Sequence, residues 1–378
     1  MTRQIWTNAV VLWLGISVIA SAQYVSEFNT QGPSARAIGE GELKGGTGET
    51  GPYEVDAAWP QPLPNHEGWT WGRTAGVWAE SPDRVFVFQS GELPALPADQ
   101  RIGRHGVPGR AAAYAAKDNR KEHLLMIFDR HGRLVDSWEQ HNDLFQSPHS
   151  VKINPHDPER HVWIIDNGAH VVRKFTNDGK LVMTLGEPGV SGLDATHFGG
   201  PTDIAFLPNG NFYISDGYGN SRVVNYSKDG KYLMDWGTWG AGPSQFNQPH
   251  SITIDGQGRV YVADRANSRI QVFDSRGQYL DEWPNIRFPL HIRASADGHL
   301  WVADMLTHQM LKYNLEGRLI YSWGVFGGQP GHLWGVHGFS TDAEGNFYVA
   351  EVFNGRVQKF KPKKGLEAWK FVGSLTVS

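Results

Sequence analysis

The sequence contains no cysteine, and this absence excludes two kinds of chemistry. No disulfide can form, and no thiolate can serve as nucleophile or metal ligand. Apart from its N-terminus, the chain also has no apolar run long enough to span a bilayer. It has no long basic run, and its net charge is −4. These features argue against nucleic acid as the partner.

The N-terminus carries the one strongly apolar segment, MTRQIWTNAVVLWLGISVIASAQ. Its basic start, apolar centre and small residues Ala20-Ser21-Ala22 predict a signal peptide over residues 1–22, cleaved near Gln23. The alternative is an uncleaved membrane anchor. We expect the mature protein to be periplasmic or secreted, without stable membrane insertion. Residues 23–66 are rich in Gly, Pro, Ser and Glu, which predicts an irregular N-terminal arm.

From Trp69 onward the chain repeats with a period near 40 residues. Each copy predicts four strands. A turn joins the first strand to the second, which ends in Asp. A polar loop leads to the third strand, and a second turn leads to the fourth, which ends near Trp-Gly. The copies span 69–138, 145–186, 198–237, 246–283, 286–324 and 333–365, and the first carries an insertion from about Gln89 to His123. Six units of four strands predict an all-β, six-bladed β-propeller over residues 67–366, with a C-terminal tail over 367–378. We expect a monomer.

One position in these copies holds histidine in every second blade. The copies align on the residue that ends strand two: Gln89, Asp166, Asp216, Asp264, Asp304 and Glu351. Counting back to the start of strand one gives Ala75, His149, Thr202, His250, Leu290 and His337. First strands line the channel of a propeller, so His149, His250 and His337 should converge about 120° apart. This is the geometry of a three-histidine zinc site with an open position. The alternative is three channel histidines that bond only to water and backbone.

Another histidine, His291, lies one residue beyond the aligned Leu290. Strand alternation should turn its side chain away from the channel. We therefore interpret His291 as structural, together with three histidines of turns and outer strands, His156, His161 and His170.

The loops between strands two and three should surround the mouth of this site. DGYGNSR at 216–222 carries Tyr218, and DRANSR at 264–269 begins its loop with Arg265. A phenol beside a metal ion and a guanidinium can act as a base near neutral pH. The alternative role of Tyr218 is that of an aromatic side chain in packing. The alternative role of Arg265 is that of a structural partner of a neighbouring aspartate. The insertion carries Arg101, Arg104 and Arg110, and could form a lid.

Several segments resemble one enzyme family: HFGGPTDIAF, YISDGYGNSRVV, FNQPHSITID, YVADRANSRIQVF and GWTWGRTAGV. The repeats resemble NHL repeats, and these motifs resemble the peptidyl-α-hydroxyglycine α-amidating lyases. The resemblance implies a six-bladed propeller that cleaves a carbinolamide into a peptide amide and glyoxylate. It implies zinc ligands at His149, His250 and His337, a catalytic base at Tyr218 and a site arginine at Arg265.

The chain departs from the pattern of this family at two site positions. The family has an arginine after strand two of the first blade, where this chain reads Gln89-Ser90-Gly91. The family also has an aspartate, linked to a structural calcium ion, directly after the third histidine. Gly338 stands there in this chain, which argues against the calcium. Gly219 replaces a family cysteine in the tyrosine loop.

The sequence leaves three functions open. The first is a zinc-dependent lyase of the amidating type, acting on a small molecule or a peptide, and the histidines and Tyr218 favour it. The second is a non-catalytic propeller that binds a peptide, protein or glycan on its top face, and the two departures favour it. The third is a metal-dependent hydrolase or lactonase, which is disfavoured because no Asp or Glu occupies the aligned channel position.

Overall fold

The computed structural model describes residues 49–95 and 120–373. The predicted signal peptide and the three lid arginines, Arg101, Arg104 and Arg110, lie outside these ranges. Within the two described ranges, no helix is both long and apolar enough to cross a membrane.

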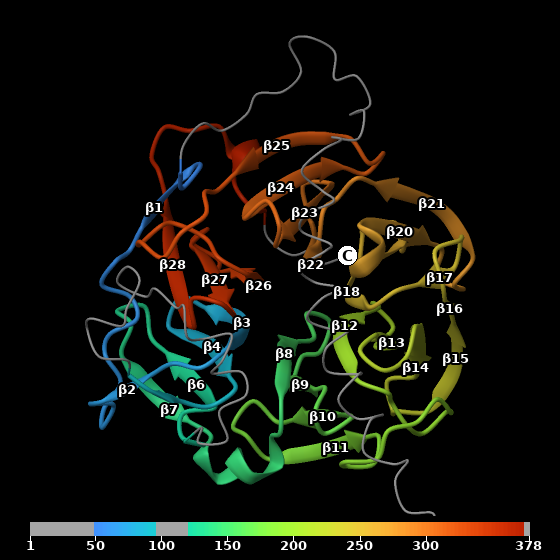
Figure 1. Ribbon diagram of the computed structural model, residues 1–378, viewed down its shortest axis with the longest axis horizontal. Coiled ribbons are helices and arrows are strands. Elements are labelled where there is room, and N and C mark those ends of the chain that lie inside the picture. The colour runs from blue at the N-terminus through green and yellow to red at the C-terminus, as the bar shows by residue number, and fades with distance from the viewer. Residues whose placement is uncertain (1–48, 96–119, 374–378) are drawn as a thin grey trace, which may run out of the picture. The chain divides into compact units, whose positions relative to one another are not determined.

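Six four-stranded antiparallel sheets stand around a central channel, which confirms the predicted propeller (Figure 1). Blade one contains β3 (Thr74–Ser81), β4 (Arg84–Gln89), β6 (Leu125–Phe128) and β7 (Leu134–Ser137). Blade two contains β8 (Pro148–Ile153), β9 (Val162–Asp166), β10 (Val171–Phe175) and β11 (Leu181–Leu185). Blade three contains β12 (Pro201–Phe206), β13 (Phe212–Asp216), β14 (Arg222–Tyr226) and β15 (Tyr232–Trp236).

The other three blades follow the same plan and complete the ring. Blade four contains β18 (Pro249–Ile254), β19 (Val260–Asp264), β20 (Arg269–Phe273) and β21 (Tyr279–Pro284). Blade five contains β22 (Pro289–Ser295), β23 (His299–Asp304), β24 (Gln309–Asn314) and β25 (Leu319–Trp323). Blade six contains β26 (Val336–Thr341), β27 (Phe347–Glu351), β28 (Arg356–Pro362) and β1 (Tyr53–Val55). The first strand of each blade is the innermost, and β26 lies beside β3.

Short elements lie outside the six blade sheets, in loops and in the C-terminal tail. They are the strand pairs β2 (Trp69–Thr70) with β5 (Leu93–Pro94) and β16 (Thr238–Trp239) with β17 (Gln245–Phe246), and the 3-10 helices η2 (Glu139–Leu144), η3 (Arg265–Asn267) and η4 (Ala368–Lys370).

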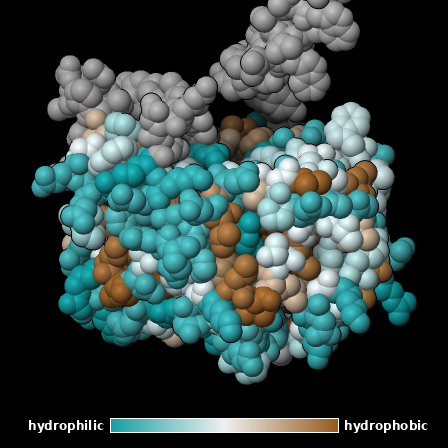
Figure 2. Space-filling view, turned by 90° about the horizontal axis from the view of Figure 1, so that it is seen from below, coloured by the Kyte–Doolittle hydropathy of each residue, from teal (hydrophilic) through white to brown (hydrophobic). Residues whose placement is uncertain are grey.

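Burial explains the amino-acid composition of the strands in each blade. The three inner strands are packed between neighbouring blades and are almost continuously apolar, as in VWIID of β9 and FYISD of β13. The fourth strands face solvent and carry exposed apolar side chains, among them Val182, Leu233 and Leu280. A side view shows such hydrophobic patches separated by hydrophilic surface (Figure 2).

A short part of the predicted N-terminal arm, Tyr53–Val55, completes the ring as a strand, while residues 23–48 of the arm lie outside the described ranges. Tyr53–Val55 form β1, which pairs with Phe360, Lys361 and Pro362 of β28. The last repeat supplies three strands, so its outer edge would otherwise stay unpaired. The Tyr53 hydroxyl also accepts a hydrogen bond from Val372 N at 2.8 Å, which ties the C-terminal tail to the arm. A three-residue strand is too short for periodicity to reveal it.

Candidate metal centre

A β-bulge in the first strand of every blade shapes the channel. The pairing register shifts by one residue at each aligned position, namely Ala75, His149, Thr202, His250, Leu290 and His337. We call these six residues the histidine layer. A bulge places two residues opposite one and re-aims side chains. In consequence the aligned residue and the residue after it both line the channel in most blades.

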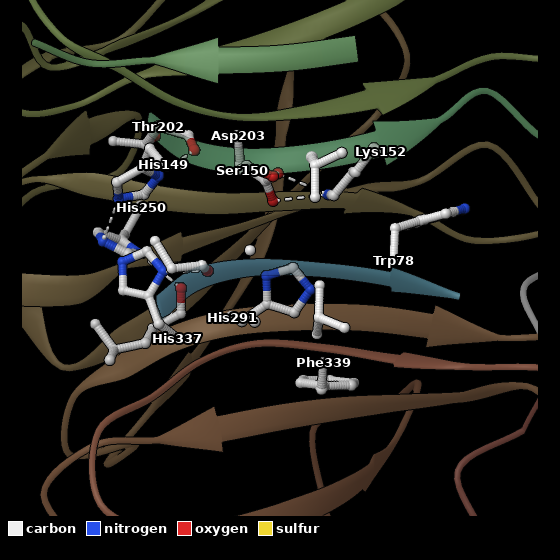
Figure 3. A pocket seen from close by; sticks show the side chains of 16 residues that line it. Trp78, His149, Ser150, Lys152, Thr202, Asp203, His250, His291, His337 and Phe339 are labelled. Carbon is white, nitrogen blue, oxygen red and sulfur yellow. Dashed lines mark hydrogen bonds and ion pairs between the residues drawn. The ribbon is translucent and has the colours of Figure 1, made fainter. Parts of the chain in front are cut away.

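The structure brings the three predicted ligands together. His149, His250 and His337 are buried, with ring centroids 4.4–4.9 Å apart (Figure 3). The Nε2 atoms of His149 and His250 lie 3.2 Å from each other. One ring nitrogen from each of the three histidines lies within 4.8 Å of the other two. Such spacing allows one ion to contact all three nitrogens.

The other three residues of the histidine layer fix the orientation of these rings. Each Nδ1–H donates to the backbone carbonyl of the aligned residue in the next blade: His149 to Thr202 O at 2.5 Å, His250 to Leu290 O at 2.6 Å and His337 to Ala75 O at 2.9 Å. A carbonyl only accepts, so Nδ1 carries the proton and Nε2 keeps its lone pair. Such bonds usually orient metal-binding imidazoles. The alignment of the repeats identified Ala75, Thr202 and Leu290 as equivalent positions. It did not predict that their carbonyls accept hydrogen bonds from the histidines.

Burial keeps the three imidazoles neutral. It lowers the pKa of His337 to about 4 and holds the pKa values of His149 and His250 well below the ordinary value. The positive charge of Arg265 lowers all three further. Neutral imidazole is the form that binds a metal ion. The donor set therefore fits zinc, which favours three histidines with an open fourth position.

Tyr218 stands at the open side of the three rings. Its hydroxyl oxygen lies 3.1 Å from Nε2 of His149 and 3.1 Å from Nε2 of His250. Gly200 makes this approach possible, because a Cβ at that residue would lie 2.8 Å from the Tyr218 Cβ. The structure thus places the predicted base beside the predicted ligands.

Arg265 is held against Tyr218 by several groups. Its Nη1 lies 3.5 Å from the Tyr218 hydroxyl, and its Nη2 donates to Gln248 Oε1 at 2.5 Å. The guanidinium carbon lies 5.2 Å from the centre of the Tyr218 ring and 5.1 Å from that of Phe288, so cation–π contacts orient it. It starts η3, directly after β19.

A buried ion pair lies one residue beyond the histidine layer. Asp203 accepts hydrogen bonds from Lys152 Nζ at 2.8 Å, Ser251 Oγ at 2.7 Å and Ser150 Oγ at 3.1 Å (Figure 3). Burial raises the pKa of Asp203, but Lys152, His291 and the hydrogen bond from Ser251 together outweigh burial, so the net shift is downward. Strand alternation did not predict a carboxylate in the channel. It does not account for the bulge at Thr202, which turns the next residue, Asp203, toward the channel as well.

The same bulge overturns the expectation for His291. Its side chain lines the channel instead of turning away, because the bulge at Leu290 aims both residues inward. His291 nevertheless stays apart from the three ligands and packs on Phe339, with ring centroids 4.9 Å apart. Burial lowers its pKa to about 3. It remains a suitable control residue in the same channel.

We expect Lys152→Met to destabilise the fold by about 3–5 kcal/mol, because it leaves Asp203 buried without its counter-charge. Denaturant unfolding of wild type and variant measures the difference. The double variant Lys152→Met/Asp203→Asn should recover much of the loss, since both charges are then gone. An equal loss in the two variants would show that packing, rather than charge, explains the effect.

The structure shows the surroundings of both departures from the family pattern. Ser90 donates its backbone N–H to Arg73 O at 3.0 Å, so another arginine of the chain stands beside the position that lacks one. Gly338 lines the channel, where a Cβ would lie 3.0 Å from Ala75 O.

A second group of possible ligands, Glu92, Glu122 and His123, lies where the blade-one insertion leaves the sheet. Glu92 is fully buried and is already bonded to Arg120 Nε at 2.6 Å and to His123 Nδ1 at 2.8 Å. A guanidinium in that place disfavours a cation. We interpret the group as an ion-pair network that joins the two ends of the insertion.

Comparison with known proteins identifies relatives. An NHL repeat model matches residues 198–226 and 246–273. NHL repeat-containing protein 3 of Mus musculus is 34% identical over 254 residues, or 63% of this chain and 72% of the mouse protein. The probable peptidyl-α-hydroxyglycine α-amidating lyase of Caenorhabditis elegans is 36% identical over 155 residues, or 40% of this chain and 43% of that protein.

Among solved structures, a streptogramin B lyase matches with a TM-score of 0.55 at 13% identity, covering 84% of this chain and 100% of that chain. An identity this low supports the fold alone. The relatives found by sequence support a family assignment, because this chain covers 72% of the mouse protein at 34% identity. The chain therefore belongs to the family of NHL-repeat propellers that includes NHL repeat-containing protein 3 and proteins named as peptidyl-α-hydroxyglycine α-amidating lyases.

Proposed function

We propose that this protein is a zinc-dependent carbon–nitrogen lyase that cleaves a carbinolamide into an amide and glyoxylate. One observation carries the proposal: the Tyr218 hydroxyl lies 3.1 Å from two histidine Nε2 atoms that face one centre. A site that merely binds a ligand has no need of a phenol at that distance from two neutral imidazoles. The named lyase among the relatives supports the same reaction class.

The side chains of the site divide the reaction between them. His149, His250 and His337 would hold zinc, which as a Lewis acid makes a bound hydroxyl group more acidic. As general base, Tyr218 Oη would take the hydroxyl proton of the carbinolamide. The carbon–oxygen double bond then forms as the carbon–nitrogen bond breaks. The nitrogen leaves with the electron pair and takes the proton that Tyr218 accepted, so the reaction needs no other reactant.

Arg265 would keep the phenol oriented during this transfer. Its guanidinium lies against the Tyr218 ring and within 3.5 Å of the hydroxyl, where it stabilises negative charge on that oxygen. Gln248 and Phe288 hold the guanidinium in this position.

We further propose that the mature protein acts as a monomer in the periplasm or outside the cell, on a small molecule or a peptide. Zinc is the proposed metal. A structural calcium ion is not part of the proposal, because Gly338 offers no carboxylate where the family has an aspartate.

The second candidate is a non-catalytic propeller that binds a peptide, protein or glycan at the same face. Ser90 favours it, because the family has an arginine at that position. Turnover separates the two candidates directly, since a binding propeller releases no product.

The test is glyoxylate release from a peptide that ends in α-hydroxyglycine. Chelated protein should be inactive, and added zinc should restore glyoxylate release with an equal amount of peptide amide. A zinc-loaded protein that binds the peptide without releasing glyoxylate would refute the lyase and support the binding propeller.

A further inference from the structure

Beyond the histidine layer, the channel region holds a buried cation without a counter-charge. Arg293 of β22 is 4% exposed and lies three residues after Leu290 of the histidine layer. Its Nη2 donates to Thr341 Oγ1 of blade six at 2.9 Å. Its Nε and Nη1 are buried and have no hydrogen-bond partner within the two described ranges. Two donors of one guanidinium are therefore left unsatisfied, which is unfavourable in a buried place.

Other buried arginines of the blades pair with carboxylates. Arg269, for example, places its Nε 2.8 Å from Asp264 Oδ2. Among the residues that the structure describes, no Asp or Glu forms an ion pair with Arg293. Burial lowers the pKa of Arg293 to about 10, and only the Tyr53 hydroxyl group counteracts this shift. Arg293 is thus a buried positive charge that the described side chains do not neutralise.

The register of the repeats explains the missing carboxylate. Lys152 occupies in blade two the position that Arg293 occupies in blade five, three residues after the histidine layer. Lys152 pairs with Asp203 of the next blade, the residue directly after the histidine layer. The equivalent of Asp203 in blade six is Gly338, which has no side chain. Arg293 therefore reaches toward a blade that offers no carboxylate at this position.

Arg293 also lines a cavity of about 60 Å³. Lys152 and His291 line it too, whereas none of its described lining residues is an Asp or a Glu. Burial is the main cause of the lowered pKa values of Lys152 and His291, and the charge of Arg293 adds to both shifts. A buried water molecule needs about 10–15 Å³, so the cavity has room for a small ion. Positive charge, unsatisfied donors and free volume meet in one place.

We propose that this cavity binds a small monovalent anion, such as chloride, which accepts hydrogen bonds from Nε and Nη1 of Arg293. The anion offsets the buried charge, as the carboxylate of Asp203 does for Lys152. It also strengthens the contact between blades five and six, which Arg293 already joins through Thr341. None of the three histidine ligands lines the cavity, so the anion contributes to stability rather than to catalysis, and the site is independent of the proposed lyase activity.

Thermal unfolding in sodium chloride and in sodium gluconate of equal ionic strength tests the site. Chloride is small enough for the cavity, whereas gluconate is not. We expect chloride to raise the Tm of the wild type by about 2–4 °C relative to gluconate once its concentration exceeds Kd about tenfold. Arg293→Met should unfold at the same temperature in both salts, because the charged donor is gone. The matched control Arg276→Met removes an exposed arginine from the turn between β20 and β21 and should keep the difference.

Anomalous scattering from wild-type crystals grown in sodium bromide locates the ion without any variant. We expect a bromide peak at hydrogen-bond distance from Nε and Nη1 of Arg293. A water molecule in that place with no bromide would overturn the proposal, and so would equal Tm values of the wild type in the two salts. A chloride response that persists in Arg293→Met would assign the anion to another site and overturn the proposal as well. If Arg293→Met does not fold, the bromide peak decides.

Discussion

A His250→Ala variant is expected to purify without zinc and to release no glyoxylate, whereas the wild type should hold about one zinc ion per chain. The substitution removes one of three nitrogen donors from a centre whose rings are buried and whose Nε2 atoms lie as close as 3.2 Å. It also leaves the Leu290 carbonyl without the hydrogen bond that it accepts from His250. Elemental analysis of wild type and variant, side by side, measures the zinc content.

His291→Ala is the matched control for this prediction. It also removes an imidazole from the channel, but one that packs on Phe339 and is not among the three converging rings. The control should keep its zinc. Equal zinc content in His250→Ala and wild type, or loss of zinc in both variants, would contradict the assignment of the ligands.

A Tyr218→Phe variant should lose about 10²–10⁴-fold in kcat for glyoxylate release while keeping its zinc and its fold. Only the hydroxyl group is removed, and the side chain is 38% exposed, so its loss leaves no buried cavity. Steady-state kinetics with an α-hydroxyglycine peptide, together with zinc content and thermal unfolding, separates chemistry from structure.

Tyr232→Phe provides the control, because Tyr232 lies in the same blade and is also 38% exposed, but on the outer strand β15. It should show wild-type kinetics. If Tyr218→Phe kept kcat within about twofold of wild type, Tyr218 would not be the base.

Much of the fold follows from the sequence because a propeller repeats a local unit. Each copy carries its own turns and strand patterns, so segments such as YISD and YVAD at the ends of β13 and β19 identify their blades without long-range information. The alignment of these copies also names His149, His250 and His337. Equivalent residues of a symmetric ring must lie at equal height, so the convergence of these residues is a consequence of the repeat.

The remaining features depend on contacts that repetition does not encode. The strand Tyr53–Val55 is too short to recognise, and it becomes a strand only because β28 presents an open edge more than 300 residues later, as its pairing of Tyr53 with Pro362 shows. The bulges are also absent from a pattern of alternation, and they decide that Asp203 and His291 line the channel.

The sequence by itself determined the propeller, the number of its blades and the three histidines. The tertiary structure decided how those histidines are held, through hydrogen bonds such as that from His337 to the carbonyl of Ala75, 262 residues away in the chain. It also decided which arginines face the mouth. The physical reason is that a repeat specifies where a side chain starts, whereas partners from neighbouring blades fix where it points.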